Sequence, residues 1–397
     1  MKNLESVNQK AQLYRDYTAQ NLSNLVKIPS PCGNEERVIS ALEQMCSDAG
    51  FDEVRVDGLG NLIGRVGKGT RVIVFDAHVD TVGPGDLGQW RKDPYSGEIA
   101  DDAVHGRGSV DQKGGAASMV TAARILKELR YNGMFSIYFT FTVLEEDCEG
   151  LCWNYIIEEQ EVRPEFAVIT EPTNLGIYRG HRGRMEMELD FPGVSSHGSA
   201  PQRGDNAIYK GSRAALAVCE LNHLLAEDPF LGRGTVTVTR ITSDSPSLCS
   251  VPDRCSLHLD RRLTWGETID SAVKEVSKAA GGEAKITVPE FNEKSYTGVR
   301  FPQKAYFPTW KIAEDHVLVQ AGVGTFQSLF QKEPERGKWV FSTNGVSICG
   351  THKIPAIGFG PGDERGAHAP NEKVPVAHLQ SASAFYALFP YVLEEAL

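Results

Sequence analysis

The sequence predicts an α/β fold: a mixed, mainly parallel sheet flanked by helices, with a smaller α+β domain inserted into it. Two observations favour this fold. Short, continuously apolar runs alternate with helical stretches, as expected for parallel strands that are covered on both faces. The middle of the chain has a different order of elements, in which two strand–helix–strand units follow one another.

The elements of the larger domain follow one another along the chain. Residues 4–27 carry apolar side chains at helical spacing and end near Pro29, which predicts a helix. Residues 113–130 are rich in Ala and Leu and have Lys and Arg near their end, which predicts another helix. Apolar runs predict buried strands at 72–75, 137–143, 166–169 and 356–359.

The inserted domain is predicted over 182–294, so that 1–181 and 295–397 form the two parts of the larger domain. Its expected elements are strand 185–191, helix 207–226, strand 235–241, strand 256–263, helix 268–280 and strand 284–288. Two βαβ units joined by a hairpin-like link predict a small, four-stranded, ferredoxin-like α/β sandwich. Such an insertion is plausible because domain termini often lie close together at the surface.

Composition and charge limit the classes of molecule that the protein is expected to bind and the compartment in which it is expected to lie. The 397-residue chain has 41 Lys and Arg against 52 Asp and Glu, a net charge of −11, which disfavours binding to nucleic acid and anionic membranes. We find neither a signal-peptide core nor an apolar run long enough to span a membrane. The eight cysteines contain no Cys-x-x-Cys pair, so we expect reduced, mostly buried thiols in a cytoplasmic protein.

Potential metal ligands follow the predicted strands. They are His78 and Asp80, Glu145 and Glu146, Glu171, His368, and Asp111 just before the helix at 113–130. Ligands of an open parallel sheet bind outside the carboxyl ends of its strands, so these side chains are expected to converge. Taken alone, the Glu pair could be a solvated acidic turn and Asp111 a helix N-cap. Together, two imidazoles and several carboxylates predict a zinc site, with cobalt or manganese as possible substitutes.

These segments resemble the M20 metallopeptidases. The matching motifs are His78-x-Asp80, Gly106-Arg107-Gly108 with Asp111 and Lys113-Gly114-Gly115, Glu145-Glu146, Glu171-Pro172, Ser196-His197-Gly198, and Gly360-Pro361-Gly362 with His368-x-Pro370-Asn371-Glu372. The family includes acetylornithine deacetylase, succinyl-diaminopimelate desuccinylase, a glutamate-releasing carboxypeptidase and several dipeptidases. The most similar subgroup is that of the hydrolases linked to selenium metabolism. The resemblance implies a zinc-exopeptidase-like fold with an inserted lid or dimerisation domain.

The resemblance also implies a dinuclear zinc site. Asp111 would bridge the two ions, His78 and Glu171 would complete one coordination sphere, and Glu146 and His368 the other. Two such ions can share one hydroxide and polarise the carbonyl of the bond that is cleaved.

Two further acidic residues receive roles from the resemblance. Asp80 would accept the second ring N–H of His78 and so fix its orientation. Glu145 would be the general base, which deprotonates the metal-held water and later passes the proton to the leaving amine. Spacing alone does not say which of Glu145 and Glu146 is the base and which the ligand.

Three residues outside the predicted metal site are candidates for contact with substrate. In the family, the histidine at the place of His197 donates a hydrogen bond to the developing oxyanion, although a turn histidine is the simpler interpretation. Arg262 could pair with a substrate carboxylate or be a surface strand arginine. Asn344 lies in a stretch that resembles a substrate-contacting segment in which Asp is common, so its role in specificity is open.

Some other polar residues near the motifs are interpreted as structural. Cys148 and Cys152 follow the Glu pair and could be oxidised or compete for metal, but buried structural thiols are the preferred interpretation. His105, His181 and His352 are also taken as structural.

The leading hypothesis is a dinuclear zinc amidohydrolase that cleaves the amide bond of a small N-acyl amino acid. A dipeptidase or exopeptidase of the same family is the alternative, and a metal-dependent binding protein without catalysis is a third. Some family members place the equivalent of His197 in the neighbouring chain, so we expect a homodimer that forms through the inserted domain and covers its sheet edges. The acyl group and the native metal are not predicted.

Overall fold

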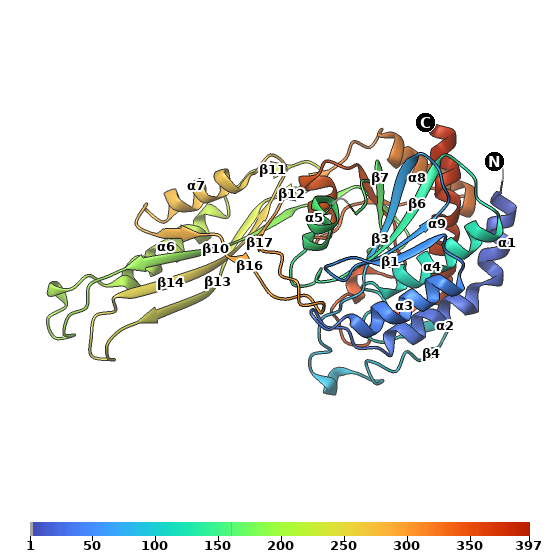
Figure 1. The fold of residues 1–397 in the computed structure, drawn as a ribbon. Helices are drawn as coiled ribbons and strands as arrows, with labels where there is room; N and C mark the ends of the chain where they lie inside the picture. The colour runs from blue at the N-terminus through green and yellow to red at the C-terminus, as the bar shows by residue number, and fades with distance from the viewer. Residues whose placement is uncertain (1–2, 160) are drawn as a thin grey trace.

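The computed structural model of the chain describes residues 3–159 and 161–397. Its larger domain is built on an eight-stranded sheet of order β1-β2-β6-β3-β7-β21-β8-β20 (Figure 1). The strands are β1 (Glu53–Val56), β2 (Leu62–Val66), β3 (Arg71–His78), β6 (Phe135–Thr142), β7 (Phe166–Ile169), β8 (Ile177–Tyr178), β20 (Arg336–Gly337) and β21 (Ala356–Gly358). Four of the neighbouring pairs are parallel and three are antiparallel. The predicted mixed, mainly parallel sheet is confirmed.

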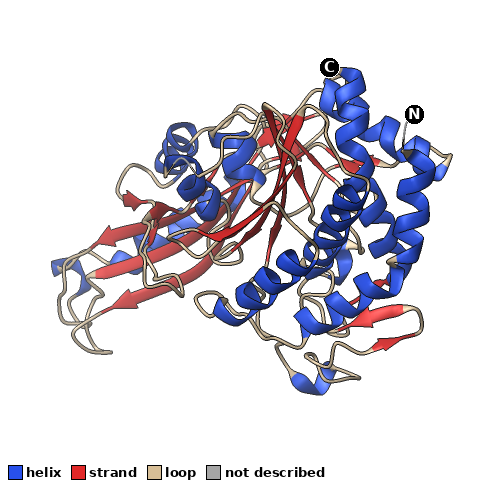
Figure 2. Ribbon diagram, turned by 45° about the vertical axis from the view of Figure 1, so that its right-hand side comes forward, coloured by secondary structure: helices blue, strands red, loops and turns tan. Residues whose placement is uncertain are grey.

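Helices cover the sheet on both sides. They are α1 (Leu4–Leu13), α2 (Arg15–Val26), α3 (Glu36–Asp48), α4 (Lys113–Glu128), α5 (Leu151–Glu158), α8 (Val317–Phe330) and α9 (Val376–Ala396). Helices α2, α4, α8 and α9 pack against one another in one layer, which Figure 2 shows beside the sheet. Helix α5 lies between the sheet and the second domain (Figure 1).

Aromatic packing holds the central strands against the helical layer. Phe75 of β3 stacks on Phe139 of β6, with ring centroids 5.4 Å apart. Phe359, just after β21, stacks on Phe385 of α9 at 3.7 Å. These residues are fully buried, which explains why the strands read as continuous apolar runs.

The second domain has its own antiparallel sheet and its own hydrophobic core. Its strands β10 (Gly183–Pro192), β13 (Thr235–Asp244), β14 (Arg254–Leu263) and β15 (Lys285–Thr287) lie in the order β13-β14-β10-β15, with helices α6 (Ala207–Leu221) and α7 (Ile269–Ala279). A separate cluster that includes Met187, Leu259 and Val276 forms its core. This arrangement agrees with the expected α+β sandwich, whereas the exact boundaries at 182 and 294 stay a prediction.

Short strands complete the structure. One small sheet joins β4 (Ile99–Ala100), β5 (Ala103–His105) and β22 (Lys373–Pro375). The other pairs are β11 (Glu227–Asp228) with β12 (Gly232–Arg233), β16 (Glu290–Phe291) with β17 (Gln303–Lys304), and β9 (Gly180–His181) with β19 (Trp310–Lys311), while β18 (Tyr306–Phe307) pairs with β10. The β9–β19 pair lies at the junction of the two domains.

Two helices differ from the sequence-based expectation. The helix expected over 4–27 is divided at Tyr14, whose ring lies 4.7 Å from the Arg124 guanidinium of α4. The helix expected over 207–226 ends at Leu221, because the next side chain, Asn222, accepts the backbone N–H of Val236 at 2.9 Å. Tertiary contacts thus decide both helix ends.

No helix within residues 3–159 and 161–397 combines the length and the apolar content that crossing a membrane requires.

Candidate metal centre

The carboxyl ends of four neighbouring parallel strands meet at one edge of the central sheet. Strands β6, β3, β7 and β21 are adjacent in that order. His78 is the last residue of β3, and Glu145 and Glu146 lie in the loop after β6. Glu171 follows β7 and His368 lies in the loop after β21. The structure therefore brings these five side chains together, as the topological argument predicts.

The Asp111 carboxylate lies between two imidazoles. Its Oδ1 is 2.9 Å from Nε2 of His78, and its Oδ2 is 3.3 Å from Nε2 of His368. Each oxygen of one carboxylate thus faces a different histidine, which is the placement expected of a ligand shared by two ions. Asp111 precedes α4, whose first turn begins at Lys113.

The other carboxylates divide between these two histidines. Glu146 Oε2 is 2.8 Å from His368 Nε2, whereas Glu171 Oε1 is 3.5 Å from His78 Nε2. Glu145 Oε2 also lies on the His78 side, at 3.9 Å from Nε2. Ligand atoms of His78, Asp111 and Glu146 all lie within 4.8 Å of one another, and so do those of His78, Glu145 and Glu171. Two overlapping sets of potential ligands are present.

Unpaired oxygens and shifted protonation equilibria indicate that this cluster is built for positive charge. Glu145 Oε1 and Glu171 Oε2 are buried and have no hydrogen-bond partner among the described residues. Burial and the neighbouring Asp111 charge raise the pKa of Glu171 to about 8. Burial also raises the pKa of Glu145 well above its usual range. Hydrogen bonds to Asp111 and Glu146 raise the pKa of His368 to about 10. Divalent cations would replace the protons that these raised pKa values place on the carboxylates and on His368. The residues therefore fit a metal centre.

The Asp80 backbone, rather than its carboxylate, makes the shorter contact with His78. Nδ1 of His78 is 3.0 Å from the Asp80 carbonyl oxygen and 3.6 Å from Asp80 Oδ1. The carboxylate Oδ2 accepts the backbone N–H of Glu146 at 2.9 Å. Asp80 therefore orients one candidate ligand through its carbonyl and another through its carboxylate.

Two ligand loops contain residues in the left-handed region of backbone space. Leu144 has φ 63° and directly precedes the Glu pair, and His368 has φ 57°. Such values are unfavourable for side chains of this kind and persist where the surrounding structure imposes them. These backbone conformations direct the loops after β6 and β21 toward the cluster of candidate ligands.

A buried ion pair joins the loops of Asp111 and His368. Glu372 accepts hydrogen bonds from the backbone N–H groups of Gly108, Val110 and Asp111, at 3.0, 2.7 and 3.1 Å. Arg107 donates to Glu372 Oε2 at 2.6 Å and to the carbonyl oxygen of His368 at 3.2 Å. The Arg107–Glu372 pair therefore positions two candidate ligands at once, a role that sequence reasoning missed although both residues belong to motifs of the family resemblance.

The candidate metal centre opens into a cavity of about 340 Å³. This volume suits a small molecule. Besides the metal-ligand candidates, the lining includes Glu149, Arg184, Arg262 and Ser342. Arg184 and Arg262 come from strands β10 and β14 of the inserted domain, so both domains form the cavity wall.

The two arginines are held by acidic neighbours. Asp260 accepts two hydrogen bonds from Arg262, from Nε at 2.8 Å and Nη2 at 3.0 Å. Glu149 accepts from Arg184 Nη2 at 2.8 Å and from the Ser342 hydroxyl at 2.8 Å. Sequence reasoning missed Arg184 and Glu149, although Glu149 lies close to the Glu pair in the sequence. Ser342 belongs to the same stretch as Asn344, which resembles a substrate-contacting segment.

The Asn344 side chain points into the protein rather than into the cavity. Its Nδ2 donates to Asp76 Oδ2 at 2.9 Å and to Thr142 Oγ1 at 3.1 Å. Its Oδ1 accepts from the Gly150 backbone N–H at 2.9 Å and from the Cys152 thiol. The amide is 1% exposed and all its groups are used, so in this arrangement it supports the ends of β3 and β6.

His197 is not brought to the candidate metal centre within this chain. It is exposed, its Nδ1 lies 2.7 Å from the Ser199 hydroxyl, and it does not line the cavity. The loop between β10 and α6, which carries it, lies at the end of the inserted domain that is remote from the central sheet (Figure 1).

The thiols near the Glu pair are buried. Cys148 and Cys152 are both 0% exposed, and burial raises the pKa of each thiol. None of the eight cysteines forms a disulfide; four are buried, two are partly buried and two are exposed, so half of the thiols rather than most of them are buried.

Comparison with known proteins identifies the family. Residues 74–391 match peptidase family M20/M25/M40. The uncharacterized protein YgeY of Escherichia coli (strain K12) is 48% identical over 385 residues, which are 96% of either chain. Acetylornithine deacetylase of Aliivibrio salmonicida (strain LFI1238) is 29% identical over 359 residues, 85% of this chain and 86% of the relative. The fold matches the crystal structure of aminopeptidase PepT from Bacillus cereus ATCC 10987 with a TM-score of 0.74 at 22% identity, covering 96% of this chain and 98% of that one. The chain belongs to peptidase family M20/M25/M40.

Proposed function

We propose that the protein is a dinuclear zinc-dependent hydrolase that cleaves the amide bond of a small N-acyl amino acid. One observation carries this proposal: the Asp111 carboxylate lies between His78 and His368, with an oxygen directed at each. The similarity to an acetylornithine deacetylase supports deacylation over peptide cleavage.

Each ion would have its own ligands and share one. His78 and Glu171 would hold one ion, Glu146 and His368 the other, and Asp111 would contact both. Imidazole and carboxylate ligands suit zinc and also accept Co²⁺ or Mn²⁺.

Glu145 is the proposed general base. The bound ions would polarise the amide carbonyl and lower the pKa of the attacking water. Glu145 would take the proton from this water and return it to the nitrogen of the leaving amine, so it ends the cycle ionised as it began. Its Oε1 has no partner among the described residues and is therefore available to accept this proton.

Arg262 is the proposed partner of a substrate carboxylate. Asp260 holds its Nε and Nη2 edge, while Nη1 has no hydrogen-bond partner in the described part of the chain. A guanidinium fixed in this way loses little side-chain entropy when it binds a carboxylate.

His197 is proposed to act in a homodimer, where the inserted domain of one chain reaches the cavity of the other. The position of its loop, remote from the central sheet of the same chain, supports action in trans. Strand β13 forms an edge of the second sheet. Tyr209 and Leu216 of α6 and Ile241 of β13 are exposed by 64%, 72% and 53%, so both elements offer apolar area for a partner. Hinge motion between the domains would then close the cavity.

Two isosteric variants test the assignment of the Glu pair. Glu145→Gln should lower turnover by about two orders of magnitude or more while both ions stay bound. Glu146→Gln should instead release one ion, and Asp147→Asn, at an exposed neighbouring position, is the control that should change neither quantity. If the Glu145 variant loses metal and the Glu146 variant keeps it, the two roles have to be exchanged.

A substrate panel tests the reaction. N-acetyl, N-succinyl and N-carbamoyl amino acids should be hydrolysed in the presence of Zn²⁺ or Co²⁺, and dipeptides more slowly. Preference for dipeptides would make the protein a peptidase of the family. Metal binding without hydrolysis of any compound in the panel would favour the non-catalytic alternative.

A further inference from the structure

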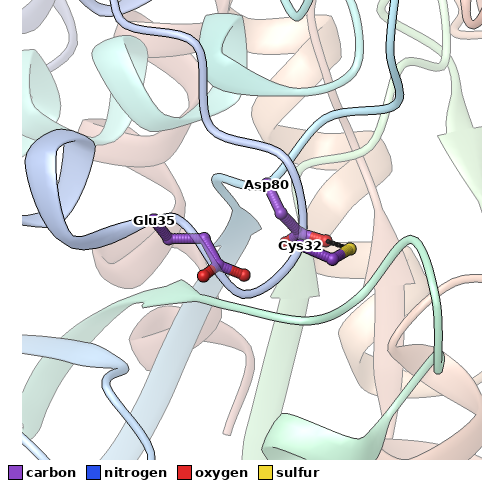
Figure 3. Close-up of side chains that lie close together, drawn as sticks. All are labelled: Cys32, Glu35 and Asp80. Atoms are coloured by element: carbon purple, nitrogen blue, oxygen red, sulfur yellow. Dashed lines mark hydrogen bonds between the residues drawn. The ribbon is translucent and has the colours of Figure 1, made fainter. Parts of the chain in front are cut away.

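A second cluster of potential ligands lies next to the candidate metal centre. Cys32 belongs to the loop after α2, Glu35 is the N-cap residue of α3, and Asp80 follows β3. Figure 3 shows the Glu35 side chain directed toward the Cys32–Asp80 pair. One ligand atom from each residue lies within 4.8 Å of those of the other two. Three separate segments of the chain therefore place a sulfur and two carboxylates together.

The contacts within this cluster leave two buried oxygens unused. The Cys32 thiol donates to Asp80 Oδ2 at 3.1 Å. Glu35 Oε1 accepts backbone N–H groups from Gly33 at 3.0 Å and from Leu144 at 3.3 Å, which fixes its carboxylate. Glu35 Oε2 and Asp80 Oδ1 are buried and have no hydrogen-bond partner within residues 3–159 and 161–397.

This arrangement calls for a cation. Glu35 and Asp80 are both 0% exposed, and a buried carboxylate oxygen without a hydrogen-bond donor is strongly unfavourable. Asp80 Oδ1 lies 3.6 Å from His78 Nδ1, which is beyond hydrogen-bond distance. Burial, followed by the carboxylates of Asp80, Asp147 and Glu35, raises the pKa of the Cys32 thiol. A divalent ion would pair with both unused oxygens and with the sulfur.

We propose that Cys32, Glu35 and Asp80 bind a third divalent cation, of the thiophilic class that includes Zn²⁺, Co²⁺ and Cd²⁺. One thiolate with two carboxylates is a ligand set that such ions accept, with water as a fourth ligand. Cys32 is only half-buried, which leaves a route for water and for the ion. When the ion binds, Cys32 releases its thiol proton to solvent and becomes a thiolate.

Asp80 connects this third site to the candidate metal centre. Its carbonyl oxygen contacts His78, and its Oδ2 accepts the backbone N–H of Glu146. An ion on Asp80 Oδ1 would therefore share the carboxylate that holds the Glu146 backbone through Oδ2. The third site does not depend on the proposed reaction, because it uses none of the residues assigned to hold the two catalytic ions.

Cobalt absorption spectroscopy tests the proposal without a substrate. The dinuclear centre contains only nitrogen and oxygen ligands, so a thiolate-to-cobalt charge-transfer band reports a cysteine. Wild-type protein titrated with Co²⁺ should bind a third equivalent, and the band should grow with that equivalent. Cys32→Ser keeps a donor for Asp80 but removes the sulfur, so it should bind two equivalents and lose the band. Glu35→Gln should weaken the binding of the third Co²⁺ equivalent and leave the affinity for the first two unchanged.

Two other thiols serve as controls. Cys148→Ser and Cys152→Ser remove buried sulfurs that also lie near carboxylates, and both variants should keep the band. A band that persists in Cys32→Ser, or two bound Co²⁺ ions without any band at saturation, would overturn the third site. The visible absorption of the cobalt bound by nitrogen and oxygen reports the dinuclear centre separately, so failure of the third site and failure of the proposed function are distinguishable.

Discussion

The Arg107–Glu372 pair makes a quantitative prediction about how the metal centre is held. Arg107→Lys keeps the charge opposite Glu372 but removes the second branch of the guanidinium, which donates to the His368 carbonyl oxygen at 3.2 Å. It also removes the planar group that lies 5.4 Å from the Trp90 ring. Each lost contact is worth about 1 kcal/mol, so we expect a loss of about 2 kcal/mol in the free energy of unfolding.

The larger effect should fall on one metal. His368 and Asp111 are both oriented by this pair, whereas Glu171 is not. Loss of a group that orients a ligand typically weakens metal binding by roughly 10- to 100-fold. We expect a loss of affinity of this size for the ion that Glu146 and His368 would hold.

Metal titration and urea unfolding, each with the apo and the metal-loaded protein, measure both effects. The control is Arg365→Lys, on the same loop but with its side chain 87% exposed, which should change neither quantity. If Arg107→Lys lowers the stability of the apo protein but retains both ions at unchanged affinity, the pair stabilises the fold without positioning His368, and the reasoning is refuted.

Three further predictions concern the ions, the dimer and pH. Asp111→Ala should impair both sites of the dinuclear centre, since it removes the shared ligand, and in a Cys32→Ser background, which lacks the third site, metal analysis that still finds one tight ion would contradict this. Mixed dimers of His197→Ala and Glu145→Gln chains should regain one active site if His197 acts in trans, whereas proven heterodimers without activity would place His197 elsewhere. Burial lowers the pKa of His181 to about 4, so this residue binds a proton only in the unfolded chain between pH 6.5 and that value. Stability should therefore fall as pH drops through this range, by up to about 3 kcal/mol, and the fall should be smaller in His181→Gln.

The sequence predicted the central sheet and the convergence of the metal-ligand candidates for a physical reason. Buried parallel strands read as uninterrupted apolar runs, and each run here is followed by a polar motif. Because parallel strands end at the same edge, His78 and Glu171 must lie close together whatever the intervening segments do.

Interactions between distant segments were not predictable from local pattern. The break at Tyr14 depends on a contact with Arg124 on another helix. Asn344 stands in a stretch that resembles a substrate-contacting one, but the buried Asp76 carboxylate binds its amide and turns it away from the cavity. The remote position of His197 depends on the length of β10, which carries its loop away from the central sheet.

Glu149 connects the two domains across the cavity, and this bears on the proposed hinge motion between them. It accepts from Arg184 of the inserted domain and from Ser342 of the larger domain. The two domains have separate hydrophobic cores, so movement of one against the other leaves both cores intact. The Arg184–Glu149 pair keeps 19% and 12% of its side chains exposed. A partly exposed ion pair contributes on the order of 1 kcal/mol, so it can hold the domains together and still yield to a substrate that competes for Arg184.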